Sequence, residues 1–251
     1  MSSQVNPVLV AVIDSGWNRE QAHPRVRSGV SFVDPDDELS ALRSDDDDDR
    51  NGHGTTCAML VMEAAPTANI LPLRVFGRRL EASISQLRMA IGAAVDERSD
   101  IISMSLSTMQ ENGIEGLYAA CEAARKAGVI VVAASYRARR CGYPAVFDNV
   151  IGVRAGHMLG EWSWFYRDDF AIDCAAWGLR GAPPSTPAGH AHHPVGTSSV
   201  ATARIAGILA HFRAEHPGAS LAEAREFLAR NAARTNRPRT FSQSQVTPAP
   251  Q

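Results

Sequence analysis

Three residues of types that can perform acyl transfer stand at widely separated places in the chain. Asp14 follows an apolar run, His53 is flanked by two glycines, and Ser198 opens a second apolar segment. A serine hydroxyl attacks a carbonyl when a histidine accepts its proton and a carboxylate holds that histidine in the correct tautomer. This chemistry requires elements that bring the three side chains together.

Ser198 lies where a short Gly-Thr-Ser turn meets residues 200–212, whose apolar residues have helical spacing. The pattern places the serine in the first turn of a buried helix, where unpaired N–H groups and the positive end of the dipole face outward. The N–H of Ser198 would then help to hold an oxyanion. Serine is also an ordinary residue at a helix start, so the segment alone indicates only a cap.

Asp14 and His53 each stand at the end of a predicted element. Residues 8–13 form a continuous apolar run, typical of a strand buried on both faces. A carboxylate at the C-terminal end of such a strand lies where open α/β sheets place their active sites. His53 begins a predicted helix that extends to about Glu63. A histidine in an ordinary loop is the alternative interpretation.

Strands and helices alternate along the rest of the chain. We predict strands at 68–75, 100–106, 129–134, 149–154 and 170–175, and further helices at 84–97, 114–127 and 220–232. Ser220, with Glu223 three residues later, predicts a capping box. The alternation predicts one α/β domain over residues 1–234, three-layer α/β/α with a mostly parallel central sheet. The polar tail at 235–251 is expected to be disordered.

Composition excludes several function classes. The 251 residues carry a net charge of −2, so no nucleic-acid-binding surface is indicated. No apolar stretch approaches the roughly 18 residues of a membrane helix. The first residues lack a signal-peptide pattern, so we expect a cytoplasmic protein with no membrane partner. Four cysteines without a close pair fit free thiols, and Cys57 is expected to be a small core residue.

Two polar clusters are candidate cation sites. The acidic run at 45–49 closes an irregular segment and is predicted to be a solvated loop, although carboxylate oxygens also suit calcium. His190, His192 and His193 lie in one loop, but no carboxylate or cysteine is spaced to complete a zinc site. We therefore expect no metal and no cofactor, with calcium at the acidic run as the open alternative.

With these landmarks in register, the sequence resembles the subtilisin-like (subtilase) serine peptidases. The matching motifs are Asp14-Ser15-Gly16, Gly52-His53-Gly54-Thr55 and Gly196-Thr197-Ser198, in an order in which Ser–His–Asp triads occur. The resemblance spans about residues 7–232 and implies a subtilisin-like fold. It also implies that Ser198 is the nucleophile, His53 the general base and Asp14 the residue that orients it, in cleavage of peptide bonds through an acyl-enzyme.

The resemblance further implies how a peptide or protein substrate would be held. Substrate would lie extended beside one strand and add to it by backbone hydrogen bonds. The implied substrate-binding residues belong to that strand end and to the opposite wall of the pocket: Ser103, Ser105, Leu106, Ser107, Ala133, Ala134 and Ser135.

The segment after Ala134 departs from the family pattern. Members usually carry an asparagine there, whose side chain donates to the oxyanion, whereas this chain reads Ser135-Tyr136-Arg137. Arg137 takes the position of the asparagine, and both Tyr136 and Arg137 can donate hydrogen bonds. The oxyanion candidates are therefore these two side chains and the N–H of Ser198. Loss of such a donor typically costs about 10²–10³ in turnover.

Two functions remain open. In one, the chain is a serine endopeptidase that acts inside the cell on a restricted set of substrates, for instance in the maturation of a precursor peptide. In the other, it is a catalytically weak or inactive subtilase-fold protein that binds or scaffolds an unknown partner. The three triad residues favour the first. An aromatic cluster at 162–166 fits either packing beneath a loop or partner binding.

Overall fold

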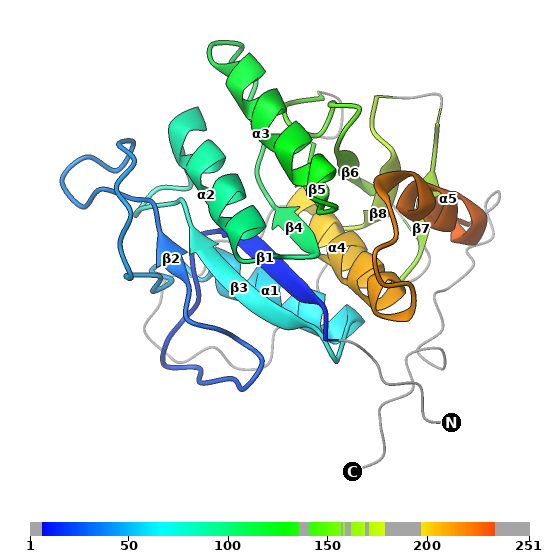
Figure 1. Ribbon diagram of the computed structural model, residues 1–251, viewed down its shortest axis with the longest axis horizontal. Coiled ribbons are helices and arrows are strands. Elements are labelled where there is room, and N and C mark those ends of the chain that lie inside the picture. The colour runs from blue at the N-terminus through cyan, green and yellow to red at the C-terminus, as the bar shows by residue number, and fades with distance from the viewer. Residues whose placement is uncertain are drawn as a thin grey trace.

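The computed structural model describes residues 7–135, 141–156, 158, 162–168, 171–178 and 197–233. Within these ranges one eight-stranded sheet has the order β2-β3-β1-β4-β5-β6-β8-β7 (Figure 1). The strands are β1 Leu9–Asp14, β2 Val30–Ser31, β3 Asn69–Arg74, β4 Ile101–Met104, β5 Ile130–Ala134, β6 Ile151–Gly156, β7 Trp164–Tyr166 and β8 Cys174–Trp177. The helices are α1 His53–Ala64, α2 Ile84–Asp96, α3 Ile114–Lys126, α4 Thr197–Glu215 and α5 Leu221–Asn231.

The sheet is parallel except for its β7 edge. Each pairing between named strands from β2 through to β8 is parallel, and only β7 runs antiparallel to β8 in the described part of the chain. The strand β1 lies between β3 and β4, with Asp14 opposite Arg74 and Ile13 opposite Met104. The prediction of a mostly parallel central sheet is confirmed.

Helices cover both faces of this sheet, which makes three layers. Alternate residues of β1 point to opposite faces because successive side chains of a strand alternate. Val10 and Val12 join the core formed with α1 and α4, whereas Ala11 and Ile13 join the core formed with α2 and α3. Because β1 is buried on both of its faces, its sequence is a nearly continuous apolar run. The three-layer α/β/α prediction is confirmed.

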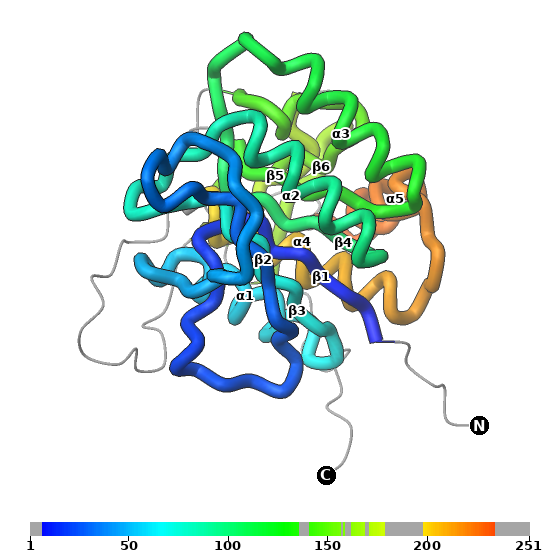
Figure 2. Tube along the Cα trace, turned by 60° about the vertical axis from the view of Figure 1, so that its left-hand side comes forward, coloured from blue at the N-terminus to red at the C-terminus, as the bar shows by residue number. Residues whose placement is uncertain are grey.

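The two helices of the site pack closely against each other. A Cβ added to Gly207 of α4 would lie 2.5 Å from the Cβ of Ala64 and 2.8 Å from the carbonyl oxygen of Val61, both in α1. The long segment between β1 and α1, blue in Figure 2, lies beside β3, with which it forms a bridge from Val26 to Ile70. The close approach at Gly207 fixes α1, which carries His53, against α4.

The edge beyond β6 differs from the prediction. A strand was expected at 170–175, but β8 begins at Cys174, opposite Val153 of β6. Asp173 explains the later start, because its carboxylate accepts from the N–H of Gly152 at 2.8 Å and pairs with Arg225 instead of continuing a strand. The short strand β7 was not predicted. Its Trp164 is buried and donates to the carbonyl of Leu228 at 3.0 Å, which favours the packing interpretation of the aromatic cluster.

The four cysteines are free thiols, and Cys57, Cys121 and Cys174 are buried. Cys57 is therefore a core residue, as predicted. None of the helices in the described ranges is both long enough and apolar enough to span a bilayer. The tail predicted at 235–251 lies outside the described residues.

Candidate active site

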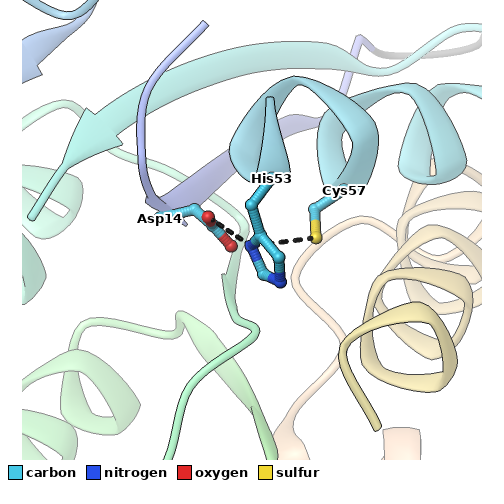
Figure 3. Close-up of side chains that lie close together, drawn as sticks. All are labelled: Asp14, His53 and Cys57. Atoms are coloured by element: carbon cyan, nitrogen blue, oxygen red, sulfur yellow. Dashed lines mark hydrogen bonds and ion pairs between the residues drawn. The ribbon is translucent and has the colours of Figure 1, made fainter. Parts of the chain in front are cut away.

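The side chains of Asp14 and His53 meet at the carboxyl edge of the sheet, where β1 ends and α1 begins. Oδ1 of Asp14 lies 2.6 Å from Nδ1 of His53, and the two side chains point toward one another (Figure 3). Both are buried, at 0 % and 4 % exposure. The same carboxylate oxygen accepts from the N–H of Ser15 at 2.8 Å, which fixes the carboxylate.

The carboxylate determines the electrostatics of the imidazole. Burial, the largest influence, acts to lower the pKa of His53 because the imidazolium loses hydration. The charge of Asp14 and its hydrogen bond outweigh this effect, so the pKa of His53 is raised above its ordinary value. Because a carboxylate only accepts, Nδ1 must carry the hydrogen in the neutral ring, which leaves Nε2 as the basic nitrogen.

Cys57 lies one turn further along α1, beside the imidazole. Its Sγ is 3.9 Å from Nδ1 of His53, and the two are drawn with Asp14 in Figure 3. The ligand atoms of the three residues lie within 4.8 Å of one another. Burial raises the pKa of the Cys57 thiol, which keeps it neutral, and Asp14 and His53 already bind each other. The arrangement therefore fits a buried hydrogen-bonded pair with a thiol beside it better than a metal centre.

The start of α4 is tied to the end of β4 at the same edge of the sheet. Ser199 donates its Oγ to the carbonyl of Ser105 at 3.1 Å, and Ser105 donates its Oγ to the carbonyl of Ser199 at 3.3 Å. Ser198, half-buried, precedes Ser199 in the first turn of α4. Its carbonyl accepts from Oγ1 of Thr202 at 2.8 Å. This reciprocal pair fixes the helix start that carries Ser198.

A pocket lies between these elements and contains part of the predicted substrate-binding set. Its lining includes His53, Ser199 and three of the predicted residues, Ser105, Leu106 and Ser107. Ser103 and Ala133 are not in the lining of this pocket. Both are fully buried within the sheet and offer a peptide no side-chain surface. Ala134 and Ser135 are also buried, with 3 % exposure each, and the N–H of Ser135 donates to the carbonyl of Val153.

Several candidates fall outside the described residues. They are the oxyanion candidates Tyr136 and Arg137 and the loop histidines His190, His192 and His193. Their roles stay predictions.

Only part of the acidic run at 45–49 is the solvated loop that was predicted, because Asp45 is exposed and Asp46 and Asp48 are half-buried. Asp47 and Asp49 are buried, at 4 % and 1 % exposure. Asp47 accepts from Nε of Arg19 and from the N–H of Gly29, both at 2.6 Å. The loop folds inward because these carboxylates find donors there, which offsets the cost of burying charge. Since their oxygens already accept from protein donors, the two buried residues do not form an open calcium site.

Asp49 is the residue that the sequence analysis missed in this site. Its carboxylate binds the N-terminal turn of α1 and the side chain of Ser15, next to Asp14. The available signal was its place four residues before His53, because aspartate is favoured where a helix begins. The surrounding aspartates masked that signal.

Comparisons with known proteins agree with this fold. A sequence model of the subtilase family matches residues 6–246. A solved structure, described as a cold adapted subtilisin-like serine proteinase, has a TM-score of 0.71 and 22 % identity. The match covers 91 % of this chain and 83 % of that one, so the two share a fold.

Curated relatives are similar over most of the chain. The thermostable alkaline protease of Halalkalibacterium halodurans is 29 % identical over 225 residues, which are 84 % of this chain and 58 % of that protein. Alkaline elastase YaB of a Bacillus species is 30 % identical over 232 residues, 88 % and 58 % of the two. Subtilisin Savinase of Lederbergia lenta is 29 % identical over 234 residues, 88 % and 81 %. The chain thus spans little more than half the length of the first two relatives.

Proposed function

Because the chain belongs to the subtilase family, we propose that it is a serine endopeptidase that cleaves peptide bonds through an acyl-enzyme. The observation that carries the proposal is the buried pair of Asp14 and His53, 2.6 Å apart at the edge of the sheet. The helix start that carries Ser198 is tied to the adjoining strand end by Ser105 and Ser199.

The three residues of the proposed triad have different tasks. The hydroxyl of Ser198 attacks the carbonyl carbon of the scissile bond, and Nε2 of His53 takes its proton. The carboxylate of Asp14 stabilises the imidazolium that forms, and the N–H of Ser198 donates to the oxyanion. The imidazolium then protonates the leaving amine, and water hydrolyses the acyl-enzyme by the same steps.

The substrate in this proposal is a peptide or protein segment in extended conformation. It pairs with the backbone at Leu106 and Ser107, because the carbonyl of Ser105 already accepts from Oγ of Ser199 and Thr108 is already paired with Tyr143. The N–H and carbonyl groups of Thr108 and Tyr143 form two hydrogen bonds of 2.9 Å with each other. The backbone that is free to pair with a substrate therefore ends at Ser107. Backbone pairing supplies affinity, and the pocket beside His53 supplies selectivity.

The proposal includes a restricted substrate range and an intracellular processing role. What supports the restriction is the sequence Ser135-Tyr136-Arg137, which lacks the usual asparagine donor. What supports the location is that the four cysteines are free thiols, as is typical of a reducing compartment. Maturation of a precursor peptide is one reaction of this kind.

A peptide-library digest tests the proposal. The full chain is incubated with a mixture of peptides of varied sequence, and mass spectrometry identifies the products. We expect cleavage of a small subset by the wild type and by Ser199→Ala, and none by Ser198→Ala. Cleavage by Ser198→Ala at the wild-type rate would contradict the assigned nucleophile. Cleavage of most peptides in the mixture would contradict the restricted range.

A further inference from the structure

We propose that Asp49 is a positioning residue, which holds the helix turn carrying His53 against the strand end carrying Asp14. The proposal rests on the function proposed above, in which Asp14 and His53 act together. Asp49 acts on this pair through the backbone and side chains on both sides of it.

Both carboxylate oxygens of Asp49 accept from groups next to the pair. Oδ1 accepts from Oγ of Ser15 at 2.8 Å, and from the N–H groups of Asn51 at 3.1 Å and Gly52 at 2.8 Å. Oδ2 accepts from the N–H of Thr55 at 2.8 Å and from its Oγ1 at 2.6 Å. One buried carboxylate thus joins the residue after Asp14 to the residues on either side of His53.

The partners of Asp49 continue these connections. Oγ of Ser15 accepts from the N–H of Gly54 at 2.8 Å, and Oγ1 of Thr55 accepts from the N–H of Asn18 at 2.9 Å. The residues that follow Asp14 and those that follow His53 are therefore joined twice through hydroxyl groups that Asp49 orients. A change at Asp49 loosens both connections.

Asp49 also replaces a missing helix cap. Gly52, the N-cap of α1, has φ +81° and no side chain to accept from the N–H groups of the first turn, which have no partner within the helix. The carboxylate of Asp49 accepts from two of them, and its negative charge faces the positive end of the helix dipole. Hydrogen bonds to an ionised acceptor are about twice as strong as neutral ones. The first turn of α1 is therefore held by the charge, not only by the shape, of this side chain.

The test compares Asp49→Asn with Asp47→Asn. The control removes a buried carboxylate from the same loop, but its partners are Arg19 and Gly29, away from α1. Asparagine preserves the shape of each side chain and turns one acceptor into a donor that faces other donors. Displacement of a catalytic group by about 1 Å costs on the order of 10²-fold in rate. We expect kcat to fall about 10- to 100-fold in Asp49→Asn, with KM nearly unchanged, and to stay near the wild-type value in Asp47→Asn.

Rates are measured well below the melting temperature of each variant. An equal fall of kcat in the two variants, or a loss confined to KM, would overturn the proposal. If Asp49→Asn does not fold, Ser15→Ala replaces it, because that variant removes one bond from Asp49 and one from Gly54. A kcat of Ser15→Ala equal to that of the wild type would likewise overturn the proposal.

An NMR titration of the His53 imidazole separates this proposal from the proposed function, because it needs no turnover. Loosening the pair with Asp14 should lower the pKa of His53 in Asp49→Asn and leave it unchanged in Asp47→Asn. An inactive wild type that shows this difference would contradict the peptidase function and support the positioning role. An unchanged pKa in Asp49→Asn would overturn the positioning role whatever the activity.

Discussion

Nδ1 of His53 lies 2.6 Å from Oδ1 of Asp14, and neither side chain has more than 4 % of its surface exposed. The two residues are 39 positions apart and come from different elements, the end of β1 and the start of α1. Their meeting follows from the parallel sheet, which places the C-terminal ends of its strands at one edge. In the proposed function this pair supplies the general base and the carboxylate that orients it.

Replacement of Asp14 by asparagine should reduce kcat by about 10⁴-fold. The asparagine side chain can present an amide N–H to Nδ1 of His53, which would place the ring hydrogen on Nε2 and remove the base. Steady-state kinetics on a cleaved peptide measure the effect, and circular dichroism checks the fold. A folded Asp14→Asn variant with a kcat within tenfold of the wild type would contradict the role of Asp14.

The activity should rise with pH through the pKa of His53. The imidazole accepts a proton from Ser198 only when it is neutral, and the Asp14 carboxylate raises its pKa above the ordinary value of 6.5. Activity is therefore lost as the pH falls and the ring becomes charged. The acidic limb of kcat/KM against pH reports this pKa in the free enzyme. A limb centred below pH 6.5 would contradict the raised pKa.

Parts of this architecture were predictable because their signals are local. The run at 8–13 predicts a buried strand, and Ser220 with Glu223 predicts the capping box that begins α5. The short strand β7 was missed because its three residues form a strand only through pairing with β8. Asp49 was missed because the hydroxyl of Ser15, a main partner, is 34 positions away in sequence. The substrate-binding roles of Ser105, Leu106 and Ser107 and the oxyanion roles of Tyr136 and Arg137 stay predictions.

Gly54 should tolerate no side chain. A Cβ at this position would lie 2.4 Å from the carbonyl oxygen of Gly16, so Gly54→Ala must push α1 away from the turn after Asp14. We expect lower stability and a loss of activity of about 10²-fold, as for a displaced catalytic group. Gly92→Ala is the matched control, because Gly92 lies within α2 with nothing within 4 Å of an added Cβ. It should raise the free energy of unfolding by about 0.5–1 kcal/mol and leave activity unchanged.

Equal stabilities of the two alanine variants in urea unfolding would contradict this account of Gly54. A Gly54→Ala variant with the wild-type kcat would also contradict it, because His53 would then keep its position without the close approach of α1 to Gly16.

Ser199→Ala should cost about 1 kcal/mol of stability, because it leaves the carbonyl of Ser105 without the Oγ donor at 3.1 Å. Urea unfolding measures the loss. Activity should fall only severalfold, because the reverse bond from Oγ of Ser105 to the carbonyl of Ser199 remains. Complete loss of activity in a stable Ser199→Ala variant would show that Ser199, and not only Ser198, takes part in the chemistry.

Covalent labelling of the folded protein with a fluorophosphonate shows whether Ser198 is an activated nucleophile, because this probe bonds to an activated serine hydroxyl. Mass spectrometry of the labelled peptide distinguishes Ser198 from its neighbour Ser199. We expect one adduct on Ser198, absent in Ser198→Ala, strongly reduced in His53→Ala and retained in Ser199→Ala. A folded wild type that takes up no probe, or an adduct on Ser199, would contradict the proposed triad of Asp14, His53 and Ser198.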